Sequence, residues 1–292
     1  MKLLWPNGAK RENILLFVTD AAPYMIKAGK GLKMLYPKMI HVICLAHAIH
    51  RVAEEVRGNY PEVDKLISNV KKIFTKTPLR VQKFKNEAPS LPLPPQPVLT
   101  RWCTWLDAAV YHCNNYDTLK KIIHSFDPAD ATSIKTAQDL FTITNMKNDL
   151  AYLKSNFGFL SSKITQLEYS GIQLSDAVNI VKYTGQELKS AKGTVAANVS
   201  AKFVTVLEKN SGFFELYDIS EILCGNKPSS DLKLQFSPCD INSFKYAPIT
   251  SCDVERSFSH YKSILSDNRK GFSFNNLQMH VVIGCNNPAN AD

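Results

Sequence analysis

Apolar residues near the start of the chain form two short runs with a helical stripe between them. Residues 14–18 contain no polar residue, which is typical of a central strand buried on both faces. Residues 39–43 predict a second strand. Between the runs, four apolar residues recur at helical spacing: Met25, Ala28, Leu32 and Leu35. This order predicts a βαβ unit with parallel strands, which places Asp20 and Cys44 at the carboxyl ends of the strands, where open α/β sheets build their sites.

Helical periodicity predominates from residue 45 to residue 210. Pro61 separates two apolar stripes, and residues 133–210 predict helix almost throughout. Residues 89–97 (PSLPLPPQP) predict an extended connector, because proline fixes φ and removes a hydrogen-bond donor. Thr100 follows the connector and is predicted to cap the next helix.

The end of the chain predicts two further helices after an irregular segment. Residues 225–246 are polar and rich in turn residues, without a clear period. Thr250 or Ser251 is predicted to cap the last long helix, and residues 275–282 predict a short closing helix. The apolar stripe of the long helix is expected to complete the core, an interface or both: Val254, Phe258, Tyr261 and Leu265.

The composition is that of a globular protein that can bury a core, since 45% of its 292 residues are hydrophobic and 21% charged. The net charge of +9 favours a polyanionic partner such as nucleic acid. Basic runs at residues 27–38 and 71–85 fit that interpretation, and each also fits a solvated helix face. The seven scattered cysteines and the lack of an apolar run near the ~20 residues of a membrane span predict a soluble, intracellular protein with reduced thiols.

Two acidic residues occupy positions where a functional site is expected. Asp20, at the end of a strand, is either a metal ligand or an acceptor that caps the following helix. Glu255, one turn into the last long helix and beside its apolar stripe, either points to the edge of the sheet or complements the positive end of the helix dipole.

Two pairs of residues have a functional and a structural interpretation. Cys44 and His47 share a helix face, as in some zinc sites, but zinc takes four ligands and no second pair has clean spacing, so local packing is the alternative. Arg101 and Trp102 either hold a phosphate and stack on an unpaired base, or Trp102 anchors the core with Trp105.

Together these segments resemble the core of a hAT-superfamily transposase. The motifs occur in the family's order, and two later segments are similar to its C-terminal dimerisation region. The resemblance covers about residues 14 to 282 and is carried by these segments: VTDAA (18–22), CLAH (44–47), TRW (100–102), ERSFS (255–259), ILSDNRK (264–270) and NNL (275–277).

The resemblance implies a mostly helical α/β protein with a ribonuclease-H-like core interrupted by a large α-helical insertion. In the family, three carboxylates hold divalent metals that activate water and then a 3′-hydroxyl. By motif, Asp20 matches the second acid and Glu255 the third. Cys44 and His47 match a pair near the site, and Trp102, next to Arg101, matches the tryptophan associated with a flipped base.

The family's first acid is expected on an earlier strand. Only 19 residues precede Asp20, and the sole acid among them is Glu12, before the same strand. Two carboxylates cannot readily hold two Mg²⁺ ions, which prefer octahedral oxygen shells. We therefore expect an incomplete core, no transposition by this chain and no cofactor; Mg²⁺ or Mn²⁺ would be required if a missing upstream acid made it an active enzyme.

The expected function is that of a transposase-derived, catalytically inactive protein that acts in the nucleus through homodimerisation and DNA binding, without a membrane or a small-molecule substrate. The resemblance assigns dimerisation to Phe258, Tyr261, Leu265 and Leu277. An active metal-dependent nuclease and a zinc- or DNA-binding regulator built on Cys44 and His47 are the alternatives.

Four consecutive segments follow from this interpretation. They are a partial ribonuclease-H-like core over residues 12–88, a Pro-rich connector over 89–99, the helical insertion over 100–245, and the core helix with the dimerisation region over 246–285.

Overall fold

The computed structural model describes residues 10–97, 103–232, 236–265, 271 and 273–285. It is mostly helical and contains one two-stranded sheet, so the predicted α/β, mostly helical class is confirmed. The chain divides into two compact units. Unit 1 comprises Met1–His47, Gln166–Ile180 and Lys209–Asp292, and unit 2 comprises Ala48–Thr165 and Val181–Glu208.

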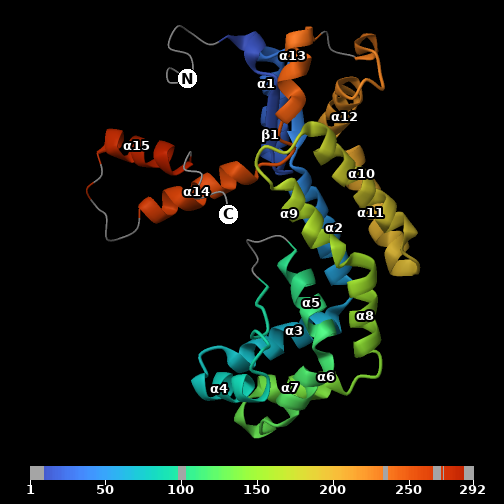
Figure 1. Ribbon diagram of the computed structural model, residues 1–292, viewed down its shortest axis with the longest axis vertical. Coiled ribbons are helices and arrows are strands. Elements are labelled where there is room, and N and C mark those ends of the chain that lie inside the picture. The colour runs from blue at the N-terminus through green and yellow to red at the C-terminus, as the bar shows by residue number, and fades with distance from the viewer. Residues whose placement is uncertain (1–9, 98–102, 233–235, 266–270, 272, 286–292) are drawn as a thin grey trace. The chain divides into compact units, whose positions relative to one another are not determined.

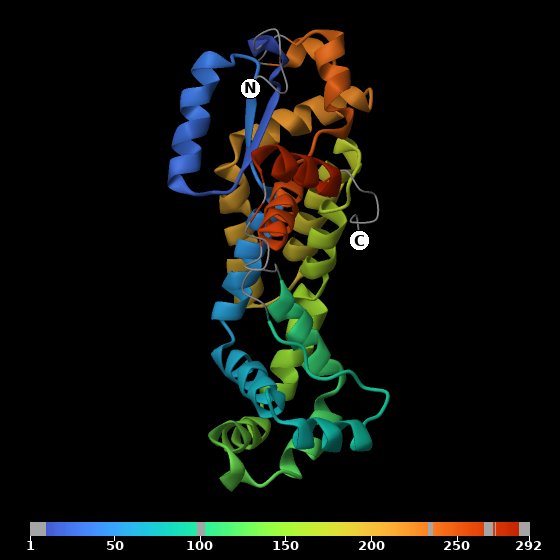
Figure 2. The ribbon, with the colours of Figure 1, turned by 90° about the vertical axis from the view of Figure 1, so that its left-hand side faces the viewer.

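The sheet of unit 1 is the predicted βαβ unit. Strands β1 (Leu16–Thr19) and β2 (Ile40–Ile43) are parallel, and helix α1 (Pro23–Leu35) joins them. Figure 2 shows the two strands side by side, with α1 in the same blue range of the colour bar. Leu16 pairs with Ile40 and Thr19 with Ile43, so both strands end at the same level and their carboxyl ends form one edge.

The two strands differ in burial. Ile40, Val42 and Ile43 of β2 are buried, whereas most of β1 is only half-buried. In the part of the chain that the structure describes, each strand pairs with the other alone, so both are edge strands, and β2 is the more buried because helix α12 (Ser211–Leu223) packs on it. The prediction that residues 14–18 form a central strand buried on both faces is wrong for this part, because an apolar run records what a strand can bury and not how many neighbours it has.

Helix α12 packs on β2. The contact depends on the side chain of its N-cap residue, Asn210, and on a glycine in its first turn, Gly212. The amide of Asn210 accepts a hydrogen bond from the backbone N–H of Ile43 (3.0 Å) and donates one to its carbonyl (2.7 Å). A Cβ atom added at Gly212 would lie 2.0 Å from the carbonyl oxygen of His41, so the helix reaches the strand only because this residue is glycine.

The rest of unit 1 includes one short helix and two longer ones. Within residues 225–246, predicted to be irregular, Ser237 and Asp240 form a capping box that begins a short helix. The sequence Ser-Pro-Cys-Asp is a signal for such a capping box, and the prediction of an irregular segment overlooked it. The helices are α13 (Pro238–Ser243), α14 (Cys252–Ile264) and α15 (Phe274–Cys285). The last two match the predicted long and closing helices, and Figure 1 shows them as a pair.

Unit 2 is built from helices and loops, without a strand among its described residues. Three helices, α2, α9 and α10, begin in one unit and end in the other. The helices are α2 (Leu45–Gly58), α3 (Pro61–Phe74), α4 (Pro78–Glu87), α5 (Thr104–Asn114), α6 (Tyr116–His124), α7 (Thr132–Phe141), α8 (Met146–Phe157), α9 (Phe159–Leu167), α10 (Leu174–Ser190) and α11 (Thr194–Glu208). The helix predicted to follow Thr100 begins at Thr104, with Cys103 as its N-cap.

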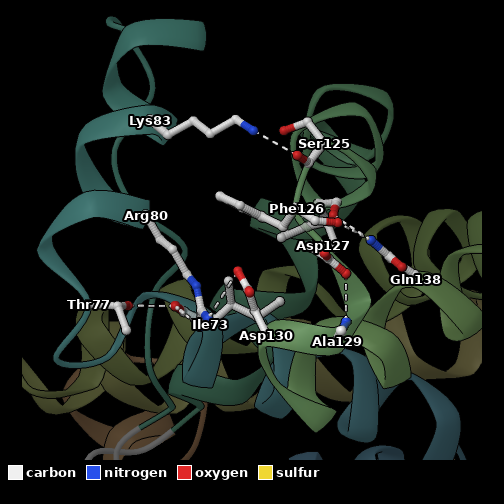
Figure 3. Close-up of polar contacts among 11 residues, drawn as sticks. Ile73, Thr77, Arg80, Lys83, Ser125, Phe126, Asp127, Ala129, Asp130 and Gln138 are labelled. Carbon is white, nitrogen blue, oxygen red and sulfur yellow. Dashed lines mark hydrogen bonds and ion pairs between the residues drawn. The ribbon is translucent and has the colours of Figure 1, made fainter.

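Part of the second basic run fixes α4 in place, as Figure 3 shows. The Lys83 ammonium donates to the carbonyl of Ser125 (2.7 Å) and lies 5.0 Å from the ring centroid of Phe126. The Arg80 guanidinium lies 3.8 Å from the carboxylate of Asp130 and donates to the carbonyl of Ile73 (3.5 Å). These two cations therefore have a structural role within unit 2.

Candidate functional site

The candidate site lies at the carboxyl edge of the sheet in unit 1, where the segment before α14 binds the end of β2. The N–H of Cys44 donates to the carbonyl of Thr19 (2.7 Å), which ties β2 to β1. The N–H of Leu45 donates to the carbonyl of Ile249 (3.0 Å), and the N–H of Ser251 donates to the Cys44 sulfur (3.2 Å). Residues about 200 positions apart in the sequence thus meet at one strand end (251 − 44 = 207).

His47 is the central residue of the candidate site. Its side chain is hydrogen-bonded to Cys44, and its Nε2 lies 3.7 Å from the Glu255 carboxylate. The contact with Cys44 is the largest cause that raises the pKa of His47, and the negative charges of Glu255 and Asp20 raise it further. Both family-assigned acids therefore act on the same imidazole.

Cys44 is buried and its sulfur accepts several hydrogen bonds. The thiol of Cys252 donates to it, as do the side chain and the backbone N–H of His47. These donors, with Cys252 first, lower the pKa of Cys44, while the same thiol contact raises the pKa of Cys252. The sequence left two interpretations open for Cys44 and His47, a zinc site or local packing. In the structure their side chains are hydrogen-bonded to each other, and the sequence did not predict that Cys252 joins them.

The two acids already have partners of their own. A carboxylate oxygen of Asp20 accepts the N–H of Ala22 (3.1 Å), a local bond in the turn before α1. The N-cap of α1 is Ala22 and no side chain caps the helix, so Asp20 does not fill the predicted capping role. Glu255 Oε1 accepts the hydroxyl of Ser251 (3.0 Å) in the first turn of α14.

These neighbours do not fit a divalent metal site as the family would build it. Among the residues that the structure describes, no group of three or more His, Cys, Asp or Glu side chains is arranged to hold a metal ion. A two-metal centre needs a larger set of oxygen ligands than Asp20 and Glu255 supply.

A third carboxylate lies at the same place and was not predicted. Glu168 is half-buried, which raises its pKa, and the charges of Glu255 and Cys44 act on it. Arg256 bonds both the Glu168 carboxylate (3.3 Å) and the Glu168 carbonyl (3.1 Å), and it also bonds Asp253 (3.1 Å). This arginine attaches α14 to the residue that follows α9, and nothing in the sequence near Glu168 predicted the contact.

The residues assigned to dimerisation lie on α14, at its C-cap (Leu265) and on α15. Phe258 exposes 62% of its surface, and Tyr261 and Leu265 are also exposed, while Leu277 is half-buried. The same two helices expose five further large apolar side chains: Val254, Phe274, Met279, Val282 and Ile283. Arg101 and Trp102, assigned to DNA, lie outside the described residues.

Each basic run divides into cations held by acids or carbonyls and cations exposed to solvent. In the first run, Lys38 bonds Asp240 (2.6 Å) and Lys33 lies 3.8 Å from Glu215, whereas Lys27 and Lys30 are exposed. In the second run, three exposed lysines remain beside the two cations of Figure 3: Lys72, Lys76 and Lys85.

No family model, curated protein or solved structure matches this chain. Across the described residues, none of the helices combines the length and the apolar character that crossing a bilayer requires.

Proposed function

We propose that this protein is a transposase-derived module of the hAT type, catalytically inactive, that self-associates through α14 and α15. The observation that carries the proposal is the exposed apolar surface of these helices, led by Phe258 and by Phe274, which is 79% exposed. Apolar side chains scattered singly are normal on a protein surface, whereas many of them gathered on one pair of helices are typical of an interface.

The inactive state is supported by the donor set at the sheet edge. The charges of Asp20 and Glu255 both raise the pKa of His47, in line with the neighbouring acids of the resemblance, yet each carboxylate accepts a hydrogen bond from a residue of its own segment. A carboxylate that holds a turn or the first turn of a helix through such a bond has a structural role that does not require catalysis.

Light scattering at several protein concentrations tests self-association. The wild type is expected to be a dimer at micromolar concentration, and the double variant Phe258→Ser with Phe274→Ser to be a monomer. Tyr24→Ser is the matched control, because Tyr24 is a 70% exposed aromatic residue on α1 of the same unit. A monomeric wild type would refute the proposal.

DNA binding is the second part of the proposal and is supported by Lys72, Lys76 and Lys85, which unit 2 exposes close together in sequence. Action on DNA would be consistent with the expected nuclear location. Replacing all three with alanine is expected to weaken binding to duplex DNA. The slope of log K against log salt should also become shallower, by about 0.9 for each phosphate that the variant no longer neutralises.

The control for this experiment removes the same charge elsewhere in unit 2, with Lys182, Lys189 and Lys192 changed to alanine. Equal reductions in affinity in the two triple variants would show only a non-specific effect of net charge and would contradict a specific role of Lys72, Lys76 and Lys85.

An active nuclease is the alternative, favoured because the negative charges of Asp20 and Glu255 act on the same imidazole. Mg²⁺- or Mn²⁺-dependent nicking of supercoiled DNA that is abolished in Asp20→Asn would establish it, in place of the inactive module.

A further inference from the structure

The carboxyl edge of the sheet holds two cysteines whose sulfurs are in hydrogen-bond contact. Cys44 follows β2, Cys252 begins α14, and the thiol of Cys252 donates to the sulfur of Cys44. The backbone on both sides holds them there, through the bonds from Leu45 to Ile249 and from Ser251 to the Cys44 sulfur. The fold itself therefore brings the two sulfurs together.

We propose that Cys44 and Cys252 form a reversible disulfide on exposure to a peroxide, so that this dithiol is an oxidative modification site. The sulfur of Cys44 is the nucleophile, because the N–H groups of Ser251 and His47 and the His47 side chain stabilise its anionic form. Cys252 is the resolving cysteine, since it is the thiol already in contact.

The reaction balances with hydrogen peroxide as the oxidant. The Cys44 thiolate attacks one oxygen, the O–O bond breaks, and a sulfenic acid and hydroxide form, the hydroxide taking a proton to become water. The Cys252 sulfur then attacks the sulfenic sulfur, the S–O bond breaks, and a second water leaves with the Cys252 proton. Two thiols lose two electrons to one peroxide, and a small thiol reductant reverses the change by exchange.

Access favours a small oxidant. Cys44 is fully buried and Cys252 is 4% exposed, but the neighbouring His47 and Glu255 side chains reach solvent, with exposed fractions of 28% and 45%. Hydrogen peroxide is close to water in size. Cys224 and Cys239 are exposed cysteines of the same unit and serve as internal references for the reactivity of an accessible thiol.

The disulfide would change what holds α14. It would join residues 208 positions apart (252 − 44 = 208) and tie the start of α14 covalently to the end of β2. It would also remove the thiolate that His47 contacts. Neither dimerisation nor DNA binding is needed for this reaction.

Mass spectrometry of the full chain tests the proposal. The folded protein is treated with hydrogen peroxide, free thiols are alkylated, and a tryptic digest is analysed without reduction. The expected product joins the peptide of residues 39–51 to that of residues 246–256, each with one cysteine, at the summed mass less two hydrogen atoms. Reduction should abolish it.

Two variants and one denatured sample make the result decisive. Cys239→Ser should keep the linked peptide, whereas Cys252→Ser should lose it and leave a Cys44 sulfenic acid that dimedone captures. Peroxide added to the urea-unfolded chain should give scattered pairs. Recovery of Cys44 and Cys252 as alkylated thiols in the folded wild type, or a linked peptide no more abundant than in urea, would overturn the proposal.

Discussion

Helices α8 and α14 carry the same kind of apolar stripe and use it in opposite ways. In α8, Met146, Leu150, Leu153 and Phe157 are fully buried, with 0% exposure. In α14, the stripe from Val254 to Leu265 is 37% to 62% exposed. A stripe of period 3.6 therefore states that a helix has an apolar face to cover, and only packing shows whether the chain itself covers it.

The largest expected effect contrasts two phenylalanines on these helices. Phe157→Ala should lower the free energy of unfolding by about 3–5 kcal/mol, because it leaves a cavity in a buried core. Phe258→Ala should change it by less than about 0.5 kcal/mol at concentrations where the chain is monomeric. Denaturant unfolding followed by circular dichroism measures both, and equal costs would break the comparison.

Two glycines of unit 1 distinguish a tightly packed contact from an exposed position. Gly212→Ala should cost about 1–3 kcal/mol or more, since its Cβ would meet the backbone of His41 and overpack the contact of α12 with β2. Gly31→Ala, on the solvent side of α1 with no atom within 4 Å, should instead stabilise the protein by about 0.4–1 kcal/mol.

The same unfolding measurement distinguishes these variants. If both glycine variants were neutral, α12 would not be packed closely against β2, which would contradict the account of this contact.

The smallest expected effect is a pH dependence at the attachment of α14. The pKa of His47 is raised above 6.5 by Cys44 and the nearby acids, so its charged form stabilises the fold. That contribution is complete below pH 6.5 and disappears as the pH rises through the raised value. Wild type should lose stability over this window relative to His47→Gln, and a parallel course of the two would contradict the pairing.

The sequence predicted the βαβ start, the parallel pairing and most helices because these follow from local patterns. It also brought Asp20, Cys44, His47 and Glu255 into one hypothesis through the resemblance. What it could not supply were partners chosen by the tertiary fold. No local pattern predicts that Glu168 lies at the site, and the role of Cys252 depends on a contact with Cys44 that only the tertiary fold makes.

The edge position of β1 shows the same limit. Residues 14–18 are apolar enough for a central strand, yet the number of neighbouring strands is decided by which other segments pair with them. The capping box at Ser237 and Asp240 is different, since a local signal was present and was overlooked.

The most direct test of self-association is photo-cross-linking from α14. Benzoylphenylalanine replaces Phe258, and chains of light and heavy isotopic composition are mixed so that links between copies can be distinguished from links within one. The proposal predicts light–heavy peptide pairs that join residue 258 to α14 or α15 of a second copy. Links confined to a single chain, or directed to unit 2 of another copy, would contradict it.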